Sequence, residues 1–131
     1  IPYHNSKCKN FHGHRAKLIA CFEGDLIKLE GDSCEGMVLD FAMLKDILMK
    51  EIHGRLDHSF IIYMGDEYCN MLLSTNTKIN VTTFIPTAEN LAVHCFDLIE
   101  KGLKDIQTIN NIKLKSIDFY ETPTSMARYE K

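Results

Sequence analysis

The chain has 131 residues, which is the size of one globular domain. Apolar residues make up 45% and charged residues 25%, as in folded proteins, so a disordered chain is excluded. A net charge of −3 without a dense basic run argues against nucleic-acid binding. The apolar runs are too short for a membrane span, and the first residues do not have the pattern of a secretion signal. We therefore expect a single domain over residues 1–131, cytoplasmic, with neither nucleic acid nor a membrane as partner.

The five cysteines are an odd number without paired spacing: Cys8, Cys21, Cys34, Cys69 and Cys95. This pattern favours free thiols in a reducing cytoplasm over a disulfide framework. Cys21 and Cys95 lie in apolar periodic segments, so we expect them in the core. Cys8 lies in a polar loop instead, beside the histidines discussed below, where the thiolate would be favoured, so we expect Cys8 to be alkylated fastest near neutral pH.

The first forty residues predict a loop and then a strand hairpin. Residues 1–15 are polar and rich in His, Cys and Asn. The apolar pattern over residues 16–29 predicts a strand with one buried face. Residues 30–36 have the composition of a turn, and residues 37–39 are expected to resume the strand.

The middle of the chain predicts a helix followed by short strands. Asp40 stands where an N-cap is needed, apolar residues follow at helical spacing, and Gly54 is expected to close the helix. Residues 60–63 and 79–84 are each apolar enough for a short strand.

The last third predicts a second helix and a second hairpin. Thr87 is a plausible N-cap after Pro86, and a buried stripe of Leu91, Cys95, Leu98 and Ile99 follows it. Residues 112–120 and 126–129 have the pattern of strands. The order strand hairpin, helix, helix, strand hairpin predicts an α+β domain.

The sharpest chemical feature is the sequence Cys8-Lys9-Asn10-Phe11-His12-Gly13-His14. In an extended segment, side chains two positions apart point to the same side, so His12 and His14 could chelate one zinc ion. A metal nearby would favour the thiolate of Cys8. The alternative is a pair of solvent-exposed histidines in a polar loop.

The dipeptide Asp57-His58 follows the first predicted helix. A carboxylate beside an imidazole can fix its tautomer and raise its basicity, as a proton relay requires. The alternative is a surface pair without a partner. Adjacent side chains of an extended chain also point apart, which argues against a direct contact.

Two further segments could hold a ligand. Thr87 and Glu89 begin the second helix, whose backbone N–H groups could face a polar ligand, although helix-start chemistry alone explains them. Glu121 follows an apolar strand, where its carboxylate could accept two N–H groups of a heterocycle. The alternative for Glu121 is a strand-end carboxylate in water.

Taken together and in order, these motifs resemble the 6-pyruvoyltetrahydropterin synthase / 6-carboxytetrahydropterin synthase family. The matching blocks span nearly the whole chain: Cys-x-x-x-His-Gly-His at 8–14, Gly-Met-Val-Leu-Asp-Phe at 36–41, Leu-Asp-His at 56–58, Pro-Thr-Ala-Glu-Asn-Leu-Ala at 86–92, and Glu121-Thr122 with Tyr129. The three residues between the cysteine and His-Gly-His resemble the bacterial 6-carboxytetrahydropterin synthases of queuosine precursor synthesis.

The resemblance implies the tunnelling fold, in which two helices cover one face of a four-stranded antiparallel sheet and subunits join into a barrel. The implied assembly is a homo-oligomer, commonly a hexamer, with active sites between neighbouring subunits. It also implies a third zinc histidine, in a segment that would precede Ile1. The domain given therefore lacks the family's first strand, and His4 is a less favoured substitute ligand.

The resemblance assigns a role to each motif. His12 and His14 would bind zinc, Cys8 would be the catalytic base, and Asp57 and His58 would form a relay. Glu121 would anchor the pterin ring and join catalysis, and Thr87 and Glu89 would also hold the substrate. The implied reaction converts 7,8-dihydroneopterin triphosphate to 6-carboxytetrahydropterin, releasing acetaldehyde and triphosphate. The alternatives are a 6-pyruvoyltetrahydropterin synthase on the same scaffold and a pterin-binding homologue without catalysis.

Overall fold

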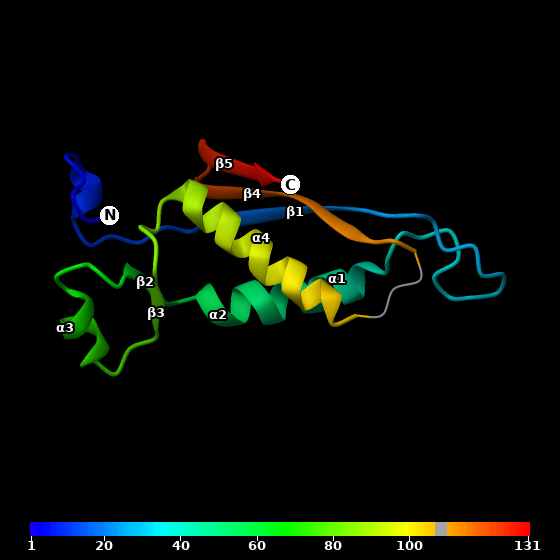
Figure 1. Ribbon diagram of the computed structural model, residues 1–131, viewed down its shortest axis with the longest axis horizontal. Coiled ribbons are helices and arrows are strands. Elements are labelled where there is room, and N and C mark those ends of the chain that lie inside the picture. Colours follow the sequence, from blue (N-terminus) through cyan, green and yellow to red (C-terminus); the bar gives the residue numbers. More distant parts are fainter. Residues whose placement is uncertain (107–109) are drawn as a thin grey trace.

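A three-stranded antiparallel sheet forms the body of the molecule (Figure 1). The computed structural model describes residues 1–106 and 110–131. Strand β4 (Lys113–Thr122) is central, with β1 (Lys17–Glu23) on one side and β5 (Ser125–Glu130) on the other. Because side chains alternate along each strand, one face of this sheet packs on helices and the other faces away from them.

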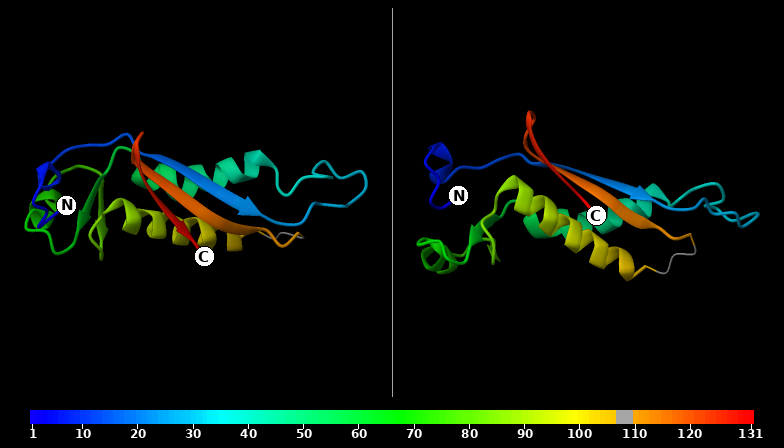
Figure 2. Two further views of the ribbon diagram at one scale, coloured as in Figure 1. Left: turned by 90° about the horizontal axis from the view of Figure 1, so that it is seen from above. Right: turned by 45° about the horizontal axis from the view of Figure 1, so that its top comes forward.

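Two helical segments cover one face of the sheet (Figure 2). The first is α1 (Phe41–Leu48), continued by the π-helical turn η2 (Met49–His53) and by α2 (Gly54–Leu56). The second is α4 (Ala88–Lys104). The core between helices and sheet is centred on side chains with almost no exposed surface, namely Cys95, Phe96, Ile99 and Ile117.

The predicted N-caps of both helices are confirmed. Asp40 Oδ1 accepts a hydrogen bond from the N–H of Ala42 at 2.7 Å. Thr87 Oγ1 accepts one from the N–H of Asn90 at 3.3 Å. Each side chain therefore satisfies a backbone donor that the first helical turn leaves free.

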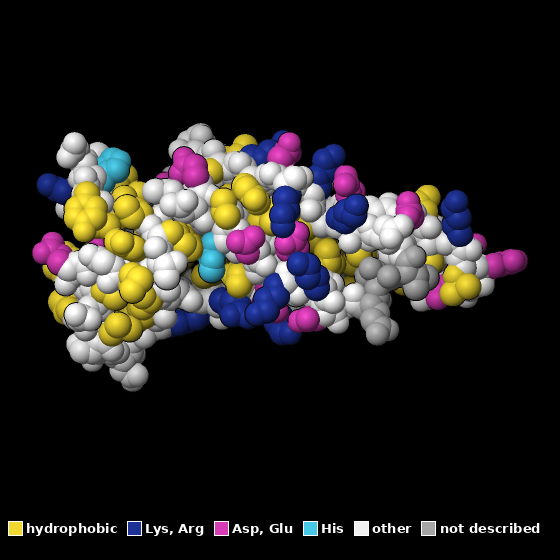
Figure 3. All heavy atoms as spheres, in the orientation of Figure 1, with side chains coloured by type: hydrophobic (Ala, Val, Ile, Leu, Met, Phe, Trp, Pro, Cys, Tyr) yellow, Lys and Arg dark blue, Asp and Glu magenta, His cyan; other side chains and the backbone are white. Residues whose placement is uncertain are grey.

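A second, smaller unit lies at one end of the molecule. It consists of β2 (Phe60–Tyr63), α3 (Cys69–Leu73) and β3 (Ile79–Thr82), and β2 and β3 pair in parallel. The N-terminal segment with its 3₁₀ turn η1 (Lys7–Lys9) packs on this unit. The ring centroids of Phe11 and Tyr68 are 5.1 Å apart. Figure 3 shows apolar side chains gathered over this end.

The predicted α+β class, with helices on one face of an antiparallel sheet, is confirmed. Within residues 1–106 and 110–131 that sheet has three strands, so the expected four-stranded sheet is not found there. Residues 37–39 do not resume the strand; Ile27 N–H instead donates to Met37 O at 2.8 Å, and the segment is a loop. Strands at 60–63 and 79–82 exist, but they pair with each other away from the main sheet.

Two further expectations are wrong. Gly54 does not close the helix, because it keeps right-handed helical geometry (φ −58°) and the chain stays helical to Leu56. Cys21 is exposed, because its position in β1 points away from the helices, whereas Cys95 is buried as expected. Burial of Cys95 raises the pKa of its thiol to about 12. In the described part of the chain, no helix combines the length and the apolar character of a membrane span.

Candidate active site

His12 and His14 lie together in the segment that leads into β1. Their ring centroids are 4.7 Å apart and the ring planes are almost perpendicular. His12 Nδ1 lies 2.6 Å from the carbonyl oxygen of Asn10. A hydrogen bond from Nδ1 to a backbone carbonyl fixes the tautomer of a metal-binding imidazole and leaves the lone pair of Nε2 free to bind the metal. The predicted proximity of the two rings is therefore confirmed.

Glu121 lies near the same two histidines, because the end of β4 is next to the start of β1. In the antiparallel pairing of β1 with β4, Lys17 lies opposite Tyr120, so Glu121 is level with the residues just before β1. Glu121 is also the extra residue of a bulge, since Tyr120 pairs with Met126 and Thr122 with Ser125. Bulges re-aim side chains, and here a carboxylate oxygen of Glu121 lies 3.4 Å from His14 Nε2.

The side chains at this end of the sheet supply part of a zinc site. Zinc prefers imidazole nitrogens in a tetrahedral arrangement, and His12 and His14 provide two such nitrogens on one side of the segment. Across residues 1–106 and 110–131, no group of three or more His, Cys, Asp and Glu side chains could hold a metal. The two histidines fit a zinc ion only together with a further ligand. Glu121 and a metal would compete for Nε2 of His14.

Two other candidates near the N-terminus, Cys8 and His4, each form a hydrogen bond with Ser6. Cys8 lies in η1, where its backbone N–H donates to Ser6 Oγ at 3.3 Å. His4 Nδ1 accepts a hydrogen bond from the N–H of Ser6 at 3.1 Å. Cys8 is partly buried, whereas Cys21 is an exposed residue.

Asp57 and His58 form a direct hydrogen bond at the end of α2. His58 Nδ1 lies 2.7 Å from Asp57 Oδ2. The expectation that neighbouring side chains point apart is wrong, because His58 has a left-handed backbone (φ 51°) instead of an extended one. The hydrogen bond from His58 holds the pKa of the Asp57 carboxyl below its ordinary value. His53, one helical turn earlier, lies 3.8 Å from the same carboxylate oxygen.

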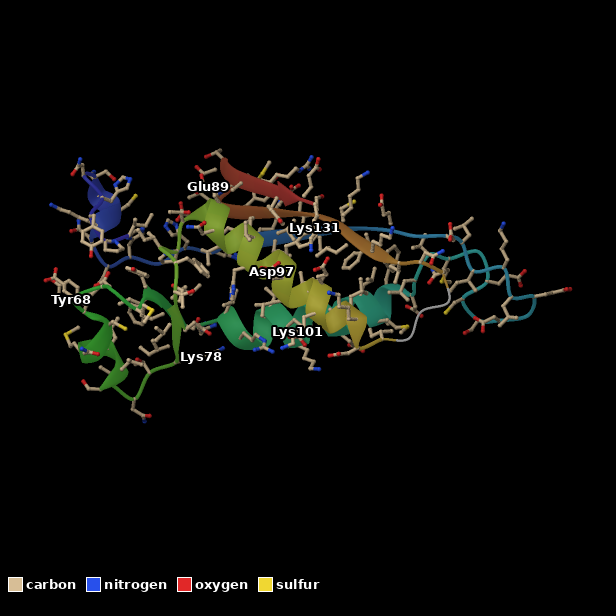
Figure 4. All side chains as sticks on the ribbon, in the orientation of Figure 1. Tyr68, Lys78, Glu89, Asp97, Lys101 and Lys131 are labelled. Atoms are coloured by element: carbon tan, nitrogen blue, oxygen red, sulfur yellow. The ribbon has the colours of Figure 1, made fainter. Side chains whose placement is uncertain are left out.

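Thr87 and Glu89 stand at the N-terminus of α4. Thr87 acts as the N-cap described above, and Glu89 is exposed in the first turn (Figure 4). A carboxylate in the first turn is stabilised by the helix dipole. Within the chain, both residues therefore have a structural role at the helix start.

The candidate residues fall into separate groups within one chain. His12, His14 and Glu121 meet at the end of the sheet where β1 begins and β4 ends, which we call the sheet edge. Asp57 meets His58 just after α2, which we call the helix end. For the residues that the structure describes, no hydrogen bond or ion pair joins one of these groups to the other.

Sequence reasoning missed Lys78, which directly precedes β3, and Asn80, which lies within it. Both contact the turn at residues 54–58, where α2 ends. Lys78 and Asn80 donate hydrogen bonds to backbone carbonyls at the end of α2. Nothing in their local sequence marks them. The parallel pairing of residues 60–63 with 79–82 is the signal that could have found them, because it places Lys78 next to the start of β2.

Comparison with known proteins relates the whole chain to pterin enzymes. The family model described as 6-pyruvoyl tetrahydropterin synthase matches residues 1–131. The 6-carboxy-5,6,7,8-tetrahydropterin synthase of Haemophilus influenzae is 34% identical over 132 residues, covering 98% of this chain and 87% of its own. The enzyme of the same name from Rickettsia conorii is 37% identical over 126 residues, covering 94% and 85%.

More distant relatives extend the comparison. The 6-pyruvoyl tetrahydrobiopterin synthase of Drosophila melanogaster is 30% identical over 125 residues, covering 94% of this chain and 61% of its own. The crystal structure of an uncharacterized protein from Wolinella succinogenes superposes with a TM-score of 0.75 at 25% identity, covering 95% of this chain and 81% of that one. The order of motifs, the fold and these matches agree, and the chain belongs to the 6-pyruvoyl tetrahydropterin synthase family.

Proposed function

We propose that this chain is a zinc-dependent lyase that converts 7,8-dihydroneopterin triphosphate to 6-carboxytetrahydropterin in queuosine precursor synthesis. The other products are acetaldehyde and triphosphate, and the atoms balance when one water molecule is consumed. The structural observation that carries the proposal is the pair of imidazoles, His12 and His14, whose ring centroids are 4.7 Å apart, with the carboxylate of Glu121 beside them. The relatives named 6-carboxytetrahydropterin synthase favour this product.

His12 and His14 are the residues of this chain that would hold the zinc ion. Bound zinc acts as a Lewis acid, which makes C–H bonds beside a coordinated oxygen more acidic. A third histidine, expected from a segment preceding Ile1, would leave the fourth position of the metal open, as in catalytic zinc sites.

The remaining residues bind the pterin and move protons. The Glu121 carboxylate accepts two N–H groups of the pterin ring, and Thr87 and Glu89 hold the ring at the start of α4. The Cys8 thiolate removes a proton from the substrate side chain. His58, oriented by its 2.7 Å contact with Asp57, carries protons to and from the reacting carbons.

We further propose that the site is shared between subunits of a homo-oligomer, with a hexamer as the expected state. Strands β1 and β5 each have one unpaired edge in the described sheet, and such edges are usually covered by another strand. A shared site also accounts for the separation of the Asp57–His58 pair from the His12–His14 pair within one chain. In this arrangement Cys8 and the zinc histidines come from one subunit and His58 from its neighbour.

Product mass is the test of the reaction. The full-length protein, loaded with zinc, is incubated with 7,8-dihydroneopterin triphosphate, and the products are measured by mass spectrometry. We expect 6-carboxytetrahydropterin and acetaldehyde. The second candidate, a 6-pyruvoyltetrahydropterin synthase, is favoured by the similarity to the Drosophila enzyme and would retain all the side-chain carbons. Substrate that is bound but unchanged would indicate a pterin-binding protein without catalysis.

A further inference from the structure

We propose that Lys78 and Asn80 are positioning residues, whose side chains cap the end of α2 and thereby hold His58 in place for proton transfer. The proposal rests on the proposed function, because it assigns His58 to the reaction. Lys78 directly precedes β3 and Asn80 lies within it, so both come from a segment about twenty residues after the turn that they hold.

Lys78 bridges two carbonyl groups of the turn. Its Nζ donates to Gly54 O at 2.9 Å and to Asp57 O at 2.8 Å. Asp57 O belongs to the peptide bond that joins Asp57 to His58. The ammonium group therefore fixes the plane of the peptide from which the His58 backbone departs. Figure 4 shows Lys78 beside the junction of α2 with the β2–β3 unit.

Asn80 and Ser59 bind the two carbonyls between those held by Lys78. Asn80 Nδ2 donates to Arg55 O at 2.9 Å and to Ser59 Oγ at 2.9 Å. Ser59 Oγ in turn donates to Leu56 O at 2.6 Å. The four consecutive carbonyls from Gly54 to Asp57 thus each accept a hydrogen bond from a side chain.

A helix leaves its last four carbonyls without partners, and helices commonly end on a glycine in left-handed geometry that redirects the chain. Here the left-handed residue is His58 (φ 51°), a conformation that costs free energy for a residue with a side chain. The caps from Lys78 and Asn80 oppose that cost. They hold the backbone geometry that brings His58 Nδ1 to Asp57.

The parallel pairing of β2 with β3 places the capping residues. Phe60 N–H donates to Lys78 O at 2.9 Å, so Lys78 is level with the start of β2, and Asn80 pairs with Ile61. The side chains then reach back over the turn between α2 and β2. The positive charge of Lys78 also suits the negative end of a helix dipole.

The cap is largely exposed, so its loss should affect position more than stability. Water can replace the lysine at each carbonyl, and hydrogen bonds at exposed sites contribute little net free energy of folding. Water has no covalent link to β3, so it cannot tie the carbonyls of Gly54 and Asp57, three residues apart, to that strand as Lys78 does. Removal of Lys78 should therefore leave a folded protein with a loosened turn.

The test compares Lys78→Met with Lys78→Arg and with the control Lys101→Met. Lys101 lies on the exposed face of α4, away from the turn (Figure 4). We expect Lys78→Met to lower kcat by about tenfold or more, as misplacement of a catalytic group does, with KM within about twofold. Lys78→Arg, which can still donate to two carbonyls, should recover most of the activity, and Lys101→Met should behave like the parent. In a His58→Ala background, Lys78→Met should cause no further loss.

The imidazole ¹⁵N spectrum of His58 provides a readout that does not depend on activity. The signal is assigned by its loss in His58→Ala. We expect the parent to show the tautomer protonated at Nδ1, and Lys78→Met to shift toward the averaged values of a free imidazole. An unchanged His58 signal in Lys78→Met would overturn the proposal, whatever happens to kcat. A shifted signal with normal kcat would also overturn it, because His58 would then be held in place without serving proton transfer. Absence of the lyase product from the parent would refute the proposed function and leave the spectral comparison decisive.

Discussion

The sheet edge and the helix end build their functional groups in opposite ways. At the sheet edge, His14 and Glu121 meet only because β1 and β4 pair in one register and a bulge re-aims Glu121. At the helix end, Asp57 and His58 are neighbours in sequence, and a left-handed backbone brings their side chains together. The first contact depends on distant segments, whereas the second depends on how one turn is held. Substitutions should therefore affect the two regions independently.

The largest expected effect comes from the helix end. His58→Ala removes the proposed proton carrier, and loss of a general acid–base group typically lowers turnover by about 10²- to 10⁴-fold. Zinc content and binding of the unreacted substrate should stay normal, because the sheet edge is intact. Steady-state kinetics and elemental analysis of the same preparation measure both. Loss of zinc in this variant would mean that the two regions are not independent.

The next effect concerns the metal at the sheet edge. His12→Ala and His14→Ala each remove one of two imidazoles, so both variants should lose zinc and activity together. Elemental analysis should give close to one zinc per chain for the full-length parent. The matched control is His53→Ala, which removes an imidazole near Asp57 and should leave the zinc content unchanged. A parent that is metal-free and fully active would refute the zinc site.

Glu121→Gln should have a smaller effect, seen mainly in substrate binding. The variant keeps the size of the side chain but would weaken the two proposed charge-assisted hydrogen bonds to the pterin ring, each worth about 1.5–3 kcal/mol. We expect KM to rise by about tenfold or more. Glu130→Gln on β5 is the control, since it removes an exposed carboxylate from the same sheet. Equal KM values for the two variants would show that Glu121 does not hold the substrate.

The smallest expected effect is on the free energy of unfolding, at the contact between α4 and η2. A Cβ on Gly102 of α4 would lie 2.8 Å from Cγ of Glu51, a buried side chain of η2 whose carboxylate binds Arg55 at 2.9 Å. Gly102→Ala should therefore lower the free energy of unfolding by about 1–3 kcal/mol, although alanine usually stabilises a helix. Thermal or urea unfolding measures this, with Lys101→Ala as control. A stabilised Gly102→Ala would mean that Glu51 moves aside freely.

The sequence predicted those features that depend on local chemistry. The N-caps at Asp40 and Thr87 and the hairpin of β4 and β5 follow from residue types and spacing, and the structure has them. The β2–β3 pairing, helix α3 and the π-helical turn were not predicted, because they depend on tertiary packing or on short segments without periodicity.

The candidate site divides along the same line. The proximity of His12 and His14 follows from their spacing, and the structure confirms it. The contact of His14 with Glu121 requires the strand register and the bulge, neither of which can be inferred from one sequence. Lys78 and Asn80 were missed because a lysine and an asparagine in a polar segment carry no signal of the carbonyls that they bind.

Complementation in mixed oligomers tests most directly the claim that the two regions form one site shared between subunits. Cys8→Ala and His58→Ala, each inactive alone, are unfolded together and reassembled, and mixed oligomers are verified by native mass spectrometry. In a closed symmetric ring with random mixing, about a quarter of the interfaces carry Cys8 and His58 both intact. The account predicts recovery of about that fraction of the parent's activity. No recovery in verified mixed oligomers would contradict it, because each chain would then have to supply both residues to its own site.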